Sequence, residues 1–290
     1  MSHVSIYRSA QGEAEILALY DRSLERIPAS FEHRMLPTRF GQTHVLVTGP
    51  ADAPPLVIFH GGNVVNGISL RWFAPLMQHY RIYAPDTMGH PGRSAQTRLS
   101  VKDNSYGQWV IDLLDSLGLE RPTLLGPSYG GGIILRTMAV APERIGRAVL
   151  LVPASAGNGS VWRMLSEILL PMFLYRLAPS PERLYRAARP MFTAEPDQDA
   201  LDVTGAVFRH VKLEAEFPQL ITAAELKRYT APTLLMAAER DIFFPADVIV
   251  PRLKAAIPHL EVEVLAGSGH YPSAAGEARI NERIREFLSR

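Results

Sequence analysis

A serine flanked by glycines, placed directly after an apolar segment, constrains the fold of this chain more than any other feature. The apolar residues 123–125 indicate a buried strand, and the pentapeptide GPSYG follows at 126–130. A helix-forming stretch starts at Gly131, so the chain must turn sharply at Ser128. Such a turn forces its central residue into sparsely populated backbone angles and leaves no space for neighbouring side chains. The pattern therefore predicts an α/β fold in which the Ser128 hydroxyl projects away from a sheet.

This strand-to-helix turn has the form of a nucleophile elbow. A serine that merely caps the start of a helix is the simpler interpretation, but it explains neither the preceding strand nor the three consecutive glycines at 130–132. A serine hydroxyl is a weak nucleophile at neutral pH, so it needs a base and an acid that orients the base. With this elbow the order along the chain is serine, acid, histidine.

Asp241 is the predicted acid, because it follows a predicted strand at 232–238 and precedes a turn. Two other carboxylates lie nearby. Glu239 is still in or beside the strand, and Asp247 already belongs to the next predicted helix. A solvated loop carboxylate is the alternative interpretation of Asp241 itself.

His270 is the predicted base. It follows the predicted strand at 261–266 through a loop that contains glycines. The nearest alternative among the nine histidines is His259, which precedes the same strand and would lie at its opposite end. The sequence thus predicts Ser128, Asp241 and His270 as catalytic residues, each at the end of a strand.

Two backbone N–H groups are expected to stabilise the negative charge that develops on an attacked carbonyl oxygen. One belongs to Tyr129, the residue after the serine. The other is assigned to Gly62, in the His-Gly-Gly sequence after the predicted strand at 55–60. Asn63 is the alternative to Gly62 and is also a candidate substrate contact. His60 is expected to fix this loop by hydrogen bonding and not to act as a base.

These features together resemble the α/β-hydrolase family. The family's strand-end motif, Asp-x-x-Gly-x-Gly-x-Ser, is similar to DTMGHPGRS at 86–94, where Pro91 adds one residue. Over the whole chain, including residues 37–44, the sequence is also similar to bacterial serine carboxylesterases of the naproxen esterase type. The resemblance implies a mostly parallel, doubly wound sheet with a helical cap inserted after the sixth strand.

The alternation of predicted strands and helices agrees with that architecture. An amphipathic helix is expected at 9–27 and another at 105–119. Strands are expected at 43–49, 55–60, 81–86, 122–127, 147–153, 232–238 and 261–266.

About eighty residues separate the predicted strand at 147–153 from the one at 232–238, far more than an ordinary connection. We expect residues 157–228 to form the cap and residues 1–156 and 229–290 to form the hydrolase core. Helices are predicted in the cap at 161–177, 180–192 and 197–216. Most of the apolar side chains in the cap are expected to seat it on the core, and the candidate substrate contacts are Trp162, Met172 and Phe173.

Composition restricts the classes of partner. The chain has 290 residues and 47% hydrophobic content, with 30 basic and 29 acidic residues and a formal charge of +1. This balance gives no electrostatic case for a nucleic acid or an anionic membrane and favours small neutral substrates. The absence of cysteine excludes disulfides, thiolate catalysis and cysteine-ligated metals. No cofactor or metal is expected, and the oligomeric state is left open.

The amino-terminal sequence does not resemble a secretory signal, and the longest apolar run, 168–175, is far shorter than the roughly 20 residues of a membrane span. A soluble, cytoplasmic protein is therefore expected.

The expected reaction is hydrolysis of a small to medium, largely apolar carboxylic ester through an acyl-enzyme. The same three residues also serve thioesters, amides, carbon–carbon bonds, acyl transfer and peracid formation. A signalling protein that uses the pocket to sense a small molecule is the alternative from another class.

Overall fold

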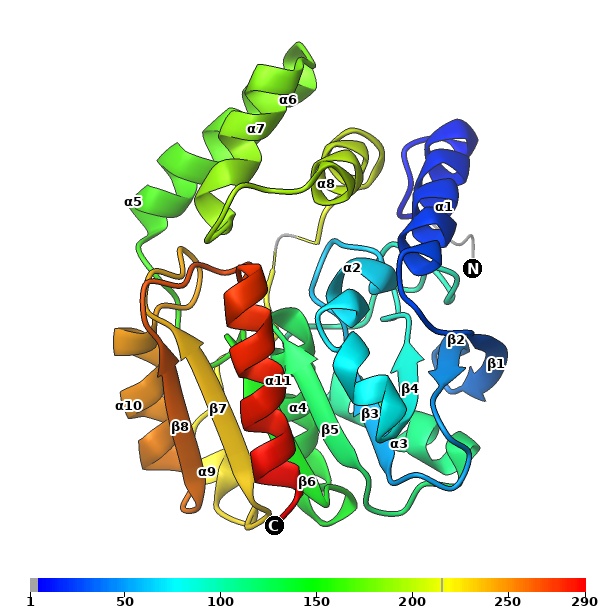
Figure 1. The fold of residues 1–290 in the computed structure, drawn as a ribbon, viewed down its shortest axis with the longest axis vertical. Helices are drawn as coiled ribbons and strands as arrows, with labels where there is room; N and C mark the ends of the chain where they lie inside the picture. Colours follow the sequence, from blue (N-terminus) through cyan, green and yellow to red (C-terminus); the bar gives the residue numbers. More distant parts are fainter. Residues whose placement is uncertain (1–4, 215) are drawn as a thin grey trace.

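The computed structural model describes residues 5–214 and 216–290 and contains one eight-stranded sheet (Figure 1). The strand order is β1-β2-β4-β3-β5-β6-β7-β8. β2 pairs antiparallel with both of its neighbours, and the remaining pairs are parallel. The strands are β1 (Glu32–Thr38), β2 (Gly41–Thr48), β3 (Pro55–Ile58), β4 (Arg81–Pro85), β5 (Thr123–Pro127), β6 (Arg147–Leu151), β7 (Thr233–Ala238) and β8 (Leu260–Leu265).

The seven predicted strands correspond to β2 to β8, and the mostly parallel sheet is confirmed. Strand β1 was not predicted. It forms a hairpin with β2 at the edge of the sheet, where Pro37 is tolerated because an edge strand need not donate every N–H group. Its residues are half-exposed or exposed along its whole length, so the strand lacks the apolar signal that marked the others.

Helices cover both faces of the sheet (Figure 1). The apolar side chains of α1 (Ala10–Glu25), α2 (Asn66–Arg71) and α11 (Ala274–Leu288) pack in one buried cluster. Those of α3 (Ser105–Leu117), α4 (Tyr129–Val140), α9 (Ala223–Leu226) and α10 (Ala246–Ala256) pack in a second cluster on the opposite face. The predicted helices at 9–27 and 105–119 are α1 and α3. Among the described residues, the structure contains no helix long and apolar enough to cross a bilayer.

A helical cap lies above the carboxyl ends of the strands, between β6 and β7, as predicted (Figure 1). The third predicted cap helix is too long, because α8 ends at His210 and the chain then extends to pair with residues near the amino terminus. The cap contains α5 (Val161–Arg163), a π-helical stretch (Met164–Leu169), α6 (Leu170–Leu177), α7 (Pro181–Ala188), a 3-10 turn (Arg189–Met191) and α8 (Gln198–His210).

The two ends of the cap segment meet at a narrow neck. The N–H group of Ile221 donates to the carbonyl oxygen of Ser155 at 2.8 Å, and the Ser155 hydroxyl donates to the carbonyl oxygen of Pro218 at 2.7 Å. Beyond the neck, α9 packs against α4 and α10 of the core. We therefore infer that the cap ends near Ile221, before the boundary at residue 228 that the sequence predicted.

Candidate active site

Ser128 lies at the turn between β5 and α4 with φ 52° and ψ −116°, an unusual conformation for a residue other than glycine. Its N–H group donates to the carbonyl oxygen of Leu151 on β6 at 2.9 Å, which helps to hold the strained residue. The flanking glycines have a steric cause. A Cβ atom at Gly126 would lie 2.4 Å from the carbonyl carbon of Gly130, and one at Gly130 would lie 2.3 Å from the carbonyl oxygen of Phe59.

Asp241 and His270 form a buried pair after β7 and β8. Nδ1 of His270 lies 2.7 Å from Oδ2 of Asp241. The other oxygen, Oδ1, accepts the N–H groups of Phe243 at 2.7 Å and Phe244 at 3.1 Å. Asp241 is 1% exposed and His270 is 8% exposed. Because an ionised carboxylate only accepts hydrogen bonds, this contact assigns the proton to Nδ1 of His270 and leaves Nε2 as a proton acceptor.

The residues that the sequence offered as alternatives to Asp241 and His270 do not lie in this buried pair. Glu239 is exposed and accepts the N–H group of Gly267 at 2.7 Å. Asp247 is exposed on α10, and His259 is exposed just before β8 begins. The structure therefore pairs His270 with Asp241 and with neither of the alternative carboxylates.

The loop after β3 packs against the serine turn. A Cβ atom at Gly62 would lie 3.1 Å from Cβ of Tyr129, and one at Gly61 would lie 3.9 Å from Cβ of Ser128. The N–H group of Asn63 donates to Nδ1 of His90 at 3.1 Å and is thus engaged. Within the described residues, the N–H groups of Gly62 and Tyr129 have no acceptor. The geometry therefore favours Gly62 over Asn63 as the second backbone donor.

His60 fixes this loop, as the sequence predicted. Its Nε2 accepts the N–H group of Thr87 at 2.8 Å, and its Nδ1 therefore carries the proton and donates to the carbonyl oxygen of Gly61 at 2.6 Å. The ring is fully buried, and burial lowers the pKa of His60. With both nitrogens engaged, His60 has no free position to act as a base.

Asn63 has a role that the sequence analysis missed. It adopts φ 51°, and its side-chain amide donates to the carbonyl oxygen of Glu214 at 2.8 Å. Its side-chain oxygen accepts the N–H group of the same residue, also at 2.8 Å. Asn63 lines the cavity described below, but its polar atoms bind the chain that follows α8. No sequence pattern links two residues so far apart.

Ser128 and His270 line one cavity of about 520 Å³ between the cap and the core. Met172 lines it, but Trp162 and Phe173 do not, and they are 80% and 54% exposed. The structure thus places the side chains of Trp162 and Phe173 outside the lining of this cavity, with Met172 inside it. The other apolar side chains of the lining are Val64, Met164, Ile168, Leu169, Met191, Val203, Phe208, Leu213, Phe217, Phe243, Phe244 and Tyr271.

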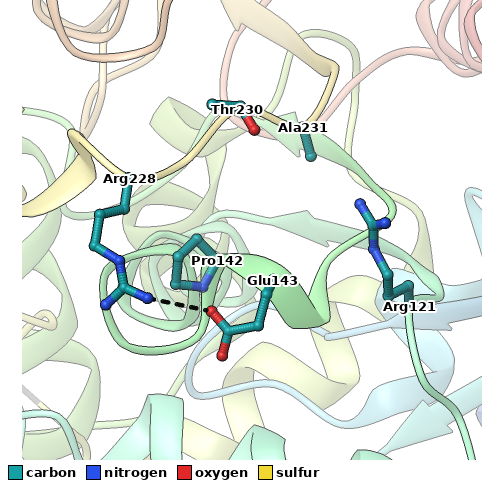
Figure 2. Close-up of a pocket in the computed structure, with 6 residues that line it drawn as sticks. All are labelled: Arg121, Pro142, Glu143, Arg228, Thr230 and Ala231. Atoms are coloured by element: carbon teal, nitrogen blue, oxygen red, sulfur yellow. Dashed lines mark ion pairs between the residues drawn. The ribbon is translucent and has the colours of Figure 1, made fainter.

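A second hollow, of about 380 Å³, lies at the amino ends of β5, β6 and β7. Figure 2 shows the ion pair at its rim, in which Arg228 lies 3.8 Å from Glu143. Its lining, completed by Arg121, Pro142, Thr230 and Ala231, offers no serine or histidine. Open α/β sheets bind ligands at the carboxyl ends of their strands, so the Ser128 cavity is the candidate active site. No group of three metal-ligating side chains occurs among the described residues.

Residues 54–274 match the family model of the alpha/beta hydrolase fold. The chain therefore belongs to the α/β-hydrolase family. It is 29% identical to carboxylesterase YbfK of Bacillus subtilis over 93% of this chain and 92% of that one. It is 28% identical to the uncharacterized carboxylesterase nap of the same organism, over 93% and 91%. The crystal structure of naproxen esterase (carboxylesterase NP) from B. subtilis superposes with a TM-score of 0.83 at 25% identity, covering 97% and 99%.

Proposed function

We propose that this protein is a serine hydrolase that cleaves carboxylic esters through a covalent acyl-enzyme. The observation that carries the proposal is the shared cavity: the strained Ser128 and the carboxylate-oriented His270 both line it. The names of two relatives as carboxylesterases support the choice of an ester over the other bonds that such a site can attack.

In the proposed mechanism, Nε2 of His270 removes the proton of Ser128 as its oxygen attacks the ester carbonyl. The N–H groups of Gly62 and Tyr129 donate to the oxyanion, and Asp241 stabilises the imidazolium that forms. His270 then gives its proton to the leaving alcohol. In the second half of the reaction, it activates water, which releases the acid and restores Ser128.

The lining favours an acyl or alcohol group with substantial apolar surface. Phenylalanine, methionine and leucine side chains from the cap and the core surround the cavity. Adaptable methionines, Met164, Met172 and Met191, suit irregular apolar groups. The substrate proposed here is therefore a small to medium ester that is largely apolar near the scissile bond.

The test compares the wild-type protein with Ser128→Ala on 4-nitrophenyl acetate, butyrate and octanoate. Turnover is expected to fall by at least about 10⁴-fold in the variant, since loss of a serine nucleophile removes the covalent route. A fluorophosphonate probe, located by mass spectrometry, is expected on Ser128. Ser100→Ala, which changes an exposed serine, is the matched control. Unchanged turnover in Ser128→Ala, or labelling at another residue, would contradict the proposal.

A further inference from the structure

Three basic side chains line the same cavity as Ser128 and His270: Arg8, Arg176 and Lys212. They come from the segment before α1, the last turn of α6 and the stretch after α8. Within the described residues, none of the three forms an ion pair, whereas most arginines of this protein lie beside a carboxylate. We call these three residues the basic rim.

The backbone brings two members of the rim together. The N–H group of Arg8 donates to the carbonyl oxygen of His210, and that of Lys212 donates to the carbonyl oxygen of Ile6, both at 2.8 Å. The ammonium group of Lys212 also donates to the carbonyl oxygen of Ser5 at 2.9 Å. The amino-terminal segment is thereby paired with the chain after α8, and this pairing fixes Arg8 at the edge of the cavity.

The rim is a region of uncompensated positive charge. Burial and the neighbouring charge of Arg176 lower the pKa of Arg8, so the two guanidinium groups are close enough to repel each other. Among the described residues that line the cavity, Glu214 carries the only carboxylate, and it lies 3.8 Å from Arg98, which does not line the cavity. Burial and the neighbouring Tyr106 raise the pKa of Tyr129, and the negative charge of Glu214 adds to this shift. The carboxylate of Glu214 is thus paired with Arg98 and, in the described part of the chain, forms no ion pair with the three residues of the basic rim.

We propose that the basic rim binds a carboxylate carried by the substrate several bonds from the ester carbonyl. The preferred substrate is then a half-ester of a dicarboxylic acid, with apolar carbons between its two ends. This inference rests on the proposed function and revises the expectation of a neutral substrate, which came from the net charge of the whole chain. The net charge of +1 conceals a local group of three exposed cations at the mouth of one cavity.

The first test compares two 4-nitrophenyl esters that share the same glutaryl chain. One is 4-nitrophenyl hydrogen glutarate, which is an anion, and the other is its neutral methyl ester. The wild-type protein is expected to prefer the anionic ester in kcat/KM. Arg8→Gln and Arg176→Gln are each expected to reduce that preference about two- to fivefold, the effect of one exposed charge pair. Arg186→Gln removes an exposed cap arginine that does not line the cavity, and it is expected to leave the preference unchanged.

Two further results are expected. Arg176→Glu should reverse the order of the two esters, and raising NaCl from 20 to 500 mM should weaken the wild-type preference, since salt screens exposed charges. Equal kcat/KM ratios in the wild type and all the rim variants, with both esters hydrolysed, would overturn the rim proposal and leave the proposed function intact.

A binding measurement separates the two proposals if neither ester is hydrolysed. Calorimetry on the unmodified protein would compare monomethyl glutarate with dimethyl glutarate. Binding of the monoanion that is lost in Arg176→Gln would support the rim although the esterase proposal had failed. Equal or absent binding of the two compounds would overturn the rim as well.

Discussion

Both carboxylate oxygens of Asp241 have fixed partners. Oδ1 accepts two backbone N–H groups, from Phe243 and Phe244, and Oδ2 faces Nδ1 of His270. Backbone N–H groups can only donate, so whatever replaces Oδ1 must accept. An asparagine at this position would therefore turn its oxygen to the backbone and its NH₂ group to His270.

Asp241→Asn is expected to lower kcat for 4-nitrophenyl butyrate about 10³- to 10⁴-fold. The NH₂ group would make Nδ1 of His270 an acceptor and move the ring proton to Nε2, which could then no longer take the proton of Ser128. Steady-state kinetics measure the loss, and circular dichroism checks that the fold is retained. If Asp241→Asn kept its activity while Asp247→Asn lost it, the assignment of the acid would be wrong.

At the residue scale, the sequence predicted positions that depend on local backbone geometry. Ser128 and Asp241 follow strands whose apolar residues are contiguous, and His270 follows β8, in which apolar residues alternate with glutamates. Their placement at one edge of the sheet therefore followed from the alternation of strands and helices. Contacts inside the cap were harder to predict. The helix that carries Trp162 and Phe173 has apolar side chains on both faces, so hydrophobicity could not indicate which face points inward.

At the scale of elements, Asn63 joins the loop after β3 to the chain after α8. Its main chain binds His90, and its side chain binds both backbone groups of Glu214. The same loop carries Gly62, the proposed oxyanion donor. The side chain of Asn63 thus joins the cap segment to the loop after β3 through two hydrogen bonds.

Asn63→Gly is expected to loosen this connection while keeping the backbone, because glycine adopts φ 51° without strain. Loss of two partly buried hydrogen bonds should lower the free energy of unfolding by about 1–3 kcal/mol and speed amide exchange at Glu214. Urea unfolding and hydrogen exchange measure these effects. Asn158→Gly, at an exposed position in the cap segment, is the control. An unchanged exchange rate at Glu214 would show that other contacts hold the cap.

The structure differs from the sequence prediction at elements stabilised by distant partners. Strand β1 is held by its pairing with β2 and not by burial of an apolar face. Helix α8 ends at His210 because the following residues form backbone hydrogen bonds with the amino-terminal segment. Local hydrophobic periodicity contains no information about either partner.

At the scale of the whole molecule, two buried and neutral histidines, His60 and His90, form hydrogen bonds with the loop after β3. Burial, with a smaller contribution from His60, lowers the pKa of His90 well below its ordinary value of 6.5, and burial lowers that of His60. The unfolded chain therefore binds more protons than the native protein once the pH falls below about 6.5. Their contribution to stability is complete above that pH and declines toward lower pH.

The free energy of unfolding is therefore expected to decrease from pH 7 to pH 5, by up to about 1.4 kcal/mol per pH unit for each histidine that remains neutral in the native state. Urea titrations across this range measure the slope. His90→Gln should reduce the slope by about one proton, whereas the exposed His259→Gln should leave it unchanged. A stability that rises toward pH 5 would contradict the assignment of neutral buried rings.

The overall architecture was the most predictable level. Alternating strands and helices predicted the parallel sheet, and the long gap after β6 predicted the cap. The cap's end inferred here differs from the predicted boundary at residue 228, because α9, which no predicted helix marked, packs on α4 and α10 of the core. The basic rim was hidden for a similar reason, since its members are far apart along the chain.

The hydrogen bonds that Ser155 forms with Ile221 and Pro218 bring the two ends of the cap segment together. A segment closed in this way can lengthen, shorten or be exchanged for another without displacing the strands beneath it. The residues proposed for bond cleavage lie outside the segment between Ser155 and Ile221, whereas Arg176, Lys212 and most of the apolar lining lie inside that segment. New substrate ranges can therefore evolve, or be grafted from a relative, by replacing one contiguous stretch of the gene while the reaction chemistry is inherited unchanged.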